Sequence, residues 1–96
     1  MNVTVTEQAA AWYKDELEIE AGTAIRFFVR YGGVGGIQPG FSLGIKMDEP
    51  REPVADTEVN GIRFFIESED DWYFDDHSLK VDYNEKWEEP DFHYEK

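Results

Sequence analysis

Cysteine is absent from this chain of 96 residues. Its absence excludes disulfide bonds, thiolate nucleophiles, and zinc or iron–sulfur sites that are built on cysteine ligands. It also removes the usual mark of an oxidising compartment. No apolar run approaches the ~18 residues of a membrane-spanning helix, and the N-terminal residues show neither the basic nor the apolar region of a signal peptide. We therefore expect a cytoplasmic protein that does not bind membranes.

Basic residues are scarce, because nine lysines and arginines stand against 22 acidic residues and give a net charge of −13. This charge repels phosphate backbones and anionic lipid, so nucleic acid is not an expected partner. The acids concentrate in residues 67–96, where twelve acids and three lysines give a net charge of −9. This segment is a solvated face, a docking surface for a basic partner, or a mimic of nucleic acid.

Aromatic residues make up 16% of the chain and can supply the core of one small domain. We expect residues 1–96 to form a single domain with an acidic C-terminal tail at about 84–96. Thr6 suits a helix N-cap, and the apolar spacing that follows predicts a helix over 6–19. Asn60-Gly61 is typical of a tight hairpin turn.

The remaining apolar residues alternate as they do in short strands. These strands are predicted at 3–5, 24–31, 41–45, 56–59, 62–66 and 79–83, with Phe92-His93-Tyr94 as a further edge strand. Trp72-Tyr73-Phe74 is predicted to lie in the core. Together these patterns indicate a mostly β (α+β) fold, a small barrel or sandwich of mainly antiparallel strands capped by one N-terminal helix.

Residues 31–36 read YGGVGG, so that Gly32, Gly33, Gly35 and Gly36 surround Val34. The segment lacks the spacing of a phosphate-binding loop and the Lys-Ser/Thr pair that follows one. Arg30 lies nearby and could pair with an anion, but the residues favour a structural turn or bulge.

His77 follows Asp75 and Asp76, and imidazole and carboxylate groups suit several divalent metals, iron among them. These residues do not have ligand spacing on one element, and the same sequence is typical of a solvated turn, so we expect no metal. Weak binding of a divalent metal such as iron through these three residues is the alternative hypothesis. No serine, histidine and carboxylate arrangement indicates a catalytic site, and we expect the protein not to be an enzyme.

The acidic tail carries three aromatic residues that are candidate contacts for a protein partner: Trp87, Phe92 and Tyr94. Trp87 stands among acids and either contacts a partner or packs back onto the domain. The tail therefore supports a second hypothesis, an acidic docking or decoy module for a basic protein.

The order of these elements resembles the HesB/IscA-like family of A-type iron–sulfur carrier and assembly proteins. The resemblance covers about residues 1–83 and rests on four segments, TEQAAAWYKDEL, IRFFVRYGGVGG with FSLGIKMDEP, VNGIRFFIES with WYF, and DDHSLKVDY. It implies a small β pseudo-barrel capped by a helix, in agreement with the patterns above.

The family binds its cluster or iron through one cysteine in the glycine loop and a Cys-Gly-Cys pair near the C-terminus. Val34 occupies the loop position here, and residues 87–92 contain no such pair. The resemblance therefore implies the fold without the cluster chemistry. We expect a non-catalytic member with no cofactor, which acts through an unidentified protein partner that is basic or related to iron–sulfur metabolism.

Overall fold

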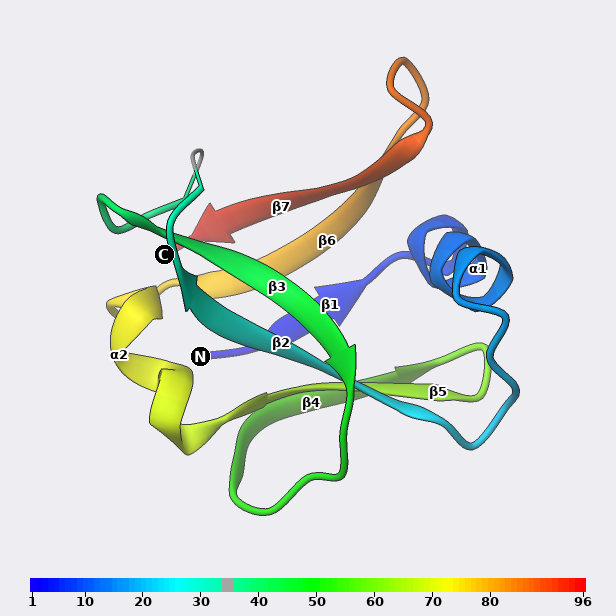
Figure 1. Ribbon diagram of the computed structural model, residues 1–96, viewed down its shortest axis with the longest axis horizontal. Helices are drawn as coiled ribbons and strands as arrows, with labels where there is room; N and C mark the ends of the chain where they lie inside the picture. The colour runs from blue at the N-terminus through cyan, green and yellow to red at the C-terminus, as the bar shows by residue number, and fades with distance from the viewer. Residues whose placement is uncertain (34–35) are drawn as a thin grey trace.

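The structure is a computed structural model that describes residues 1–33 and 36–96 (Figure 1). It is mainly β with an N-terminal helix, as the sequence predicts, and it also contains a short second helix and a 3₁₀ turn that the sequence analysis does not predict. The elements in chain order are β1 (Val3–Val5), α1 (Glu7–Glu16), β2 (Ala24–Tyr31), β3 (Phe41–Met47), β4 (Pro53–Val59), β5 (Ile62–Glu67), the 3₁₀ turn η1 (Ser68–Asp70), α2 (Asp71–Phe74), β6 (Ser78–Asn84) and β7 (Glu89–Glu95).

The strands form two mixed sheets that do not close into a barrel. One sheet has the order β1-β6-β7 and the other has the order β3-β2-β5-β4. The β4–β5 hairpin pairs Val59 with Ile62 across the predicted Asn60-Gly61 turn. Two pairings are parallel, β1 with β6 and β2 with β5. The other three pairings are antiparallel, in agreement with the expectation of mainly antiparallel strands, whereas no local signal indicates the two parallel pairs, because parallel strands join segments that no local turn connects.

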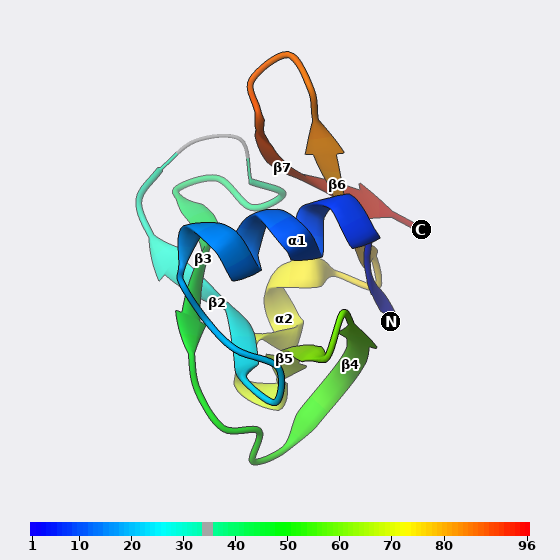
Figure 2. The same cartoon turned by 90° about the vertical axis from the view of Figure 1, so that its right-hand side faces the viewer.

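Helix α1 begins where the sequence predicts, because the Thr6 side chain accepts a hydrogen bond of 3.2 Å from the Ala9 N–H. It ends at Glu16 rather than at residue 19, since Glu18 adopts a positive φ of 52° that a right-handed helix cannot contain. Figure 2 shows α1 lying across one end of the two sheets.

The core lies between the helix and the sheets and is built on aromatic rings. Phe27 of β2 and Phe64 of β5 stack with their centroids 5.8 Å apart. Tyr13 of α1 contacts both rings, at 6.3 and 5.8 Å. Phe92 of β7 meets Phe27 edge-on at 5.7 Å, and its contact joins the two sheets. The predicted edge strand at Phe92-His93-Tyr94 is therefore confirmed and contributes to the core.

Trp72 differs from its expected position in the core, and Trp87 is exposed, which decides between the two positions left open for it. Tyr73 and Phe74 are fully buried as predicted, but Trp72 is 54% exposed. The three residues form the helical turn α2, so their side chains point in different directions. Trp87 is 66% exposed in the turn between β6 and β7, so it does not pack back onto the domain.

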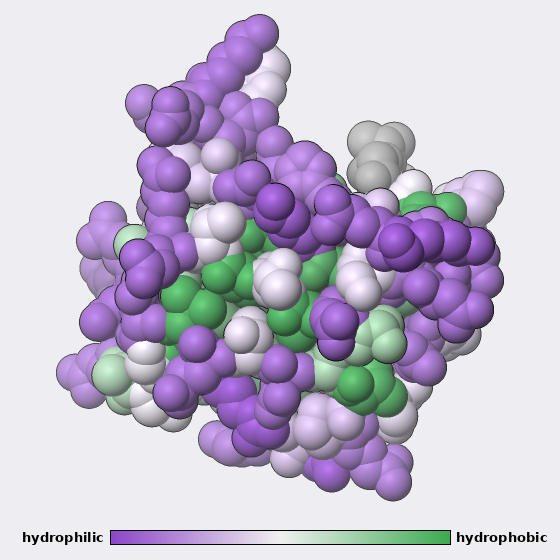
Figure 3. All heavy atoms as spheres, turned by 180° about the vertical axis from the view of Figure 1, so that it is seen from behind, coloured by the Kyte–Doolittle hydropathy of each residue, from purple (hydrophilic) through white to green (hydrophobic). Residues whose placement is uncertain are grey.

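The surface is predominantly polar, as the net charge of −13 requires. Figure 3 shows hydrophilic residues over the protruding β6–β7 hairpin and around a central apolar area. In the described part of the chain, neither helix is long and apolar enough to cross a membrane.

Candidate functional site

The glycine loop and the C-terminal strand converge on one groove. Strands β3 and β7 each form the edge of a sheet, so their outer sides have no strand neighbour. A cavity of about 360 Å³ lies between Gly33 and Gly36 on one side and Phe92 and Tyr94 on the other. A second cavity of about 420 Å³ extends along Phe92 toward α1. The two cavities share the lining residues Arg30, Leu43 and Phe92, and we refer to them together as the groove.

Hydrogen bonds fix the start of the glycine loop. The Ser42 hydroxyl donates to the Gly32 carbonyl at 2.9 Å and accepts from Arg30 Nε at 3.1 Å. The Gly32 N–H donates to the Gly40 carbonyl at 2.7 Å. The loop therefore begins at a fixed position, and the guanidinium of Arg30 lies at the edge of the groove.

The other end of the loop is fixed by Tyr73. Its hydroxyl accepts from the Ile37 N–H at 3.1 Å, and its carbonyl accepts from the Gln38 side-chain amide at 3.3 Å. A side chain on Gly36 would collide with the Tyr73 hydroxyl and the Phe41 carbonyl. This glycine is thus explained by the close approach of the chain to Tyr73. Val34 and Gly35, which complete the predicted loop, lie outside the described residues.

The groove does not offer the donors that an iron–sulfur cluster needs. The polar side chains along it near the loop are Arg30, Ser42 and Tyr94. Burial, with the hydrogen bond to Tyr73, raises the pKa of the Tyr94 phenol well above its usual range, so the phenol stays protonated. A guanidinium, neutral hydroxyls and the carboxylate of Glu89, which lines the second cavity, do not replace a set of thiolate ligands, and the chain contains no cysteine. The residues present do not fit a cluster.

The candidate metal residues form a turn that follows α2. His77 Nδ1 lies 2.9 and 3.0 Å from the carbonyls of Phe74 and Asp75, so this nitrogen carries a hydrogen and donates. Asp75 and Asp76 both have a left-handed backbone, with φ of 46° and 64°. Among residues 1–33 and 36–96, no three histidine or acidic side chains are grouped to hold a metal ion.

The three candidate partner contacts do not share one surface. Phe92 faces the core, and Tyr94 packs against Tyr73 at 6.0 Å and Phe74 at 6.1 Å. Trp87 projects from the hairpin turn, where Lys86 Nζ lies 5.4 Å from its ring centroid. The Trp12 indole N–H donates to the Glu88 carbonyl at 3.0 Å and holds this turn against α1.

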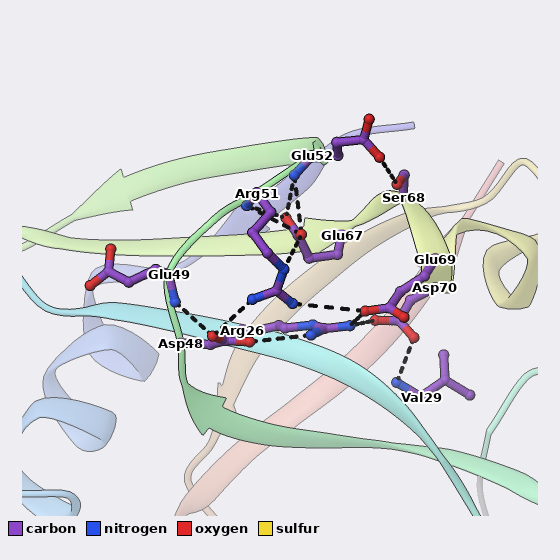
Figure 4. Close-up of polar contacts among 10 residues, drawn as sticks. All are labelled: Arg26, Val29, Asp48, Glu49, Arg51, Glu52, Glu67, Ser68, Glu69 and Asp70. Carbon is purple, nitrogen blue, oxygen red and sulfur yellow. Dashed lines mark hydrogen bonds and ion pairs between the residues drawn. The ribbon is translucent and has the colours of Figure 1, made fainter.

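Arg26 of β2 is the centre of an ion cluster that the sequence does not predict (Figure 4). The buried guanidinium of Arg26 contacts Asp48 at 3.2 Å, Glu69 at 2.6 Å and Asp70 at 2.8 Å. Asp70 also accepts from the Val29 N–H at 3.3 Å. These partners lie 22 to 44 residues from Arg26 in sequence, so no local pattern indicates them.

Neighbouring residues extend the cluster to the loop after β3. The buried carboxylate of Glu67 accepts from the backbone N–H groups of Arg51 and Glu52 at 3.1–3.2 Å. The Glu49 N–H and then Arg26 hold the pKa of Asp48 below its ordinary value. The cluster fastens the 48–52 loop and η1 to the sheet, so its role is to stabilise the fold.

Comparison with known proteins identifies relatives along nearly the whole chain. The family model described as "Iron-sulphur cluster biosynthesis" matches residues 1–93. A Bacillus subtilis protein named "Pyruvate dehydrogenase inhibitor" is 53% identical over 95 residues, which cover 99% of this chain and 100% of that protein. "Uncharacterized protein SSP1406" of Staphylococcus saprophyticus is 36% identical over 88 residues, which cover 88% of this chain and 90% of that protein. "Uncharacterized protein SH1556" of Staphylococcus haemolyticus is 37% identical over 93 residues, with coverages of 90% and 93%.

Proposed function

This chain belongs to the iron–sulphur cluster biosynthesis family, and we propose that it acts in the cytoplasm as a non-catalytic inhibitor that binds pyruvate dehydrogenase without a cluster. The observation that carries the proposal is the 53% identity, over nearly the full length of both chains, to a protein named pyruvate dehydrogenase inhibitor. An inhibitor of an enzyme needs a surface that recognises that enzyme and needs no chemistry of its own.

The composition and the groove support this reading. The family's loop ligand position holds Val34, and the chain has no cysteine to supply the others. The described groove presents Arg30, Ser42 and a protonated Tyr94 beside the loop and Glu89 farther along, a set of donors that does not suit a cluster in their place. The net charge of −13 favours a protein partner with a basic surface over nucleic acid.

The proposal is tested by adding the purified protein to purified Bacillus subtilis pyruvate dehydrogenase and following NADH formation from pyruvate. We expect inhibition that rises with protein concentration and saturates at a fixed molar ratio. A size-exclusion run of the mixture should show the two proteins in one peak. Because charge assists this association, higher salt should weaken it.

Two controls separate specific inhibition from other causes. Bovine serum albumin, another acidic protein, at the same concentration should leave the rate of NADH formation unchanged. The protein alone, with pyruvate and NAD, should form no NADH. Unchanged enzyme activity at a large molar excess of the protein, with no shared peak, would contradict the proposed function.

A further inference from the structure

Three aromatic side chains form a surface patch at the end of the molecule that lies away from the β6–β7 hairpin turn. Tyr31 ends β2, Phe41 begins β3, and Trp72 lies on α2. In Figure 1, the end of β2, the start of β3 and α2 all lie on the left-hand side. Phe41 lies between the other two, with centroid distances of 5.8 Å to Tyr31 and 5.2 Å to Trp72. We call Tyr31, Phe41 and Trp72 the aromatic patch.

Two of the three side chains in the aromatic patch, Tyr31 and Trp72, are largely exposed to solvent. Tyr31 is 87% exposed and Trp72 is 54% exposed, while Phe41 is half-buried between them. Both contacts are edge-to-face, with interplanar angles of 80° and 84°. Neighbouring exposed aromatic rings of this kind are uncommon on a polar surface and mark interaction sites.

Three acidic residues lie close to Trp72 in the sequence, on α2 and in the turn that follows it. Asp71, Asp75 and Asp76 lie within four residues of Trp72 and are all exposed. Within the described part of the chain, none of the three forms an ion pair. Their charges are therefore available to a partner. The exposed rings and these carboxylates together suit a planar cation that can stack on an aromatic ring. Arginine has such a group in its guanidinium.

A comparison with Trp87 shows why this end of the molecule is favoured. Trp87 already has the ammonium group of Lys86 over its ring at 5.4 Å. Among residues 1–33 and 36–96, no cation lies over Tyr31 or Trp72. The aromatic patch can therefore accept a cation from a partner, whereas the ring of Trp87 already contacts a cation of the same chain.

We propose that the aromatic patch is the docking surface for an arginine-bearing basic segment of the partner protein. One guanidinium of the partner stacks on Trp72 and another on Tyr31, and neighbouring basic groups pair with the exposed aspartates. This inference rests on the proposed function, because it assumes that the chain acts by binding a protein. It moves the contact surface from the acidic tail, where Trp87 was the candidate, to the end of the molecule that carries α2.

The test uses a fluorescein-labelled peptide of nine arginines, a matching peptide of nine lysines, and the full-length protein at physiological salt. Fluorescence anisotropy measures the Kd for three proteins: the wild type, the double variant Tyr31→Ala/Trp72→Ala, and the control Trp87→Ala. All have the same net charge, and the control also removes an exposed tryptophan. Circular dichroism and the unfolding temperature verify that each variant folds.

We expect the double variant to bind the arginine peptide about tenfold more weakly than the wild type, because two cation–π contacts are lost. Trp87→Ala should bind as the wild type does. The wild type should prefer the arginine peptide to the lysine peptide, since only a guanidinium stacks. Equal affinities of the wild type and the double variant, an equal loss in Trp87→Ala, or no binding by the wild type would each overturn the inference.

A second pair of variants tests the acidic part of the surface. Asp75→Asn and Asp76→Asn remove charge, and asparagine tolerates the left-handed backbone that both positions adopt. The double substitution should weaken binding of the arginine peptide at low salt more than at high salt. A loss that is the same at both salt concentrations would contradict the role given to these carboxylates.

The pyruvate dehydrogenase assay distinguishes this inference from the proposed function. Wild-type protein that inhibits, together with an aromatic-patch variant that inhibits equally well, would overturn the docking surface and leave the function intact. Wild-type protein that fails to inhibit would refute the function, and the peptide measurements would then decide the docking surface alone.

Discussion

Replacement of Asp70 by alanine should be far more damaging than replacement of Glu69, although Glu69 makes the shorter contact with Arg26. The Arg26–Glu69 distance is 2.6 Å and the Arg26–Asp70 distance is 2.8 Å. The distances alone suggest that the Arg26–Glu69 pair is the stronger, but burial makes the Arg26–Asp70 pair contribute more to stability. The Asp70 side chain is 9% exposed and that of Glu69 is 66% exposed, so water competes for the second pair and hardly for the first.

The magnitudes follow from this difference. Asp70→Ala leaves the buried guanidinium of Arg26 short of one carboxylate and removes the acceptor of the Val29 N–H. Breaking a buried ion pair in this way costs about 3–5 kcal/mol of unfolding free energy. Glu69→Ala removes an exposed contact that is worth less than about 1 kcal/mol. In a domain of this length, the first change should lower the unfolding temperature by roughly 12 °C or more and the second by a few degrees.

Urea unfolding followed by tryptophan fluorescence measures both variants against the wild type. Asp70→Asn is the matched control, because it keeps a hydrogen-bond acceptor at the same place without the charge, and its loss should fall between those of the two alanine variants. A loss in Glu69→Ala as large as that in Asp70→Ala would refute the argument that burial decides the strength of these contacts.

Two further predictions concern the glycine loop and the acid stability. Gly36→Ala should cost roughly 1–3 kcal/mol of unfolding free energy, because the added methyl group collides with the Phe41 carbonyl and the Tyr73 hydroxyl; an unchanged thermal unfolding temperature would contradict this. The lowered pKa of Asp48 contributes stability that is present above its ordinary value near ~3.9 and is lost as the pH falls through the folded value. The unfolding free energy of Asp48→Asn should therefore fall less between pH 5 and pH 3 than that of the wild type. Urea unfolding at the two pH values measures this fall, and an equal fall in both proteins would contradict the role given to Asp48.

Local signals account for the parts of the fold that the sequence predicts well. Thr6 marks the start of α1, and Asn60-Gly61 marks the β4–β5 hairpin, because each signal acts on backbone groups a few residues away. The parallel pairing of β1 with β6 joins Val3 to Leu79, and no local pattern specifies such a contact. The exposure of Trp72 depends on α2 being a helical turn, which a run of three aromatic residues does not reveal.

The sequence marks the glycine-rich segment and the aromatic tail, but not which of their residues lie together in the structure. The glycine-rich segment and its missing ligand are visible in the sequence, as is the aromatic character of the tail. That Gly36 and Tyr94 line the same groove depends on how the two sheets face each other. The placement of Phe41 between Tyr31 and Trp72 likewise joins three separate elements. Contacts of this kind follow from tertiary packing, which sequence periodicity does not encode.

The central claim is that this protein acts on a protein partner and needs no iron–sulfur cluster. The most direct measurement is the inhibition of pyruvate dehydrogenase by one preparation divided in two, of which one half is stripped with a chelator and the other is incubated anaerobically with iron and sulfide. The account predicts the same inhibition by both halves and no stable cluster absorbance in the second. Inhibition that appears only in the half incubated with iron and sulfide, together with a stoichiometric cluster, would contradict it.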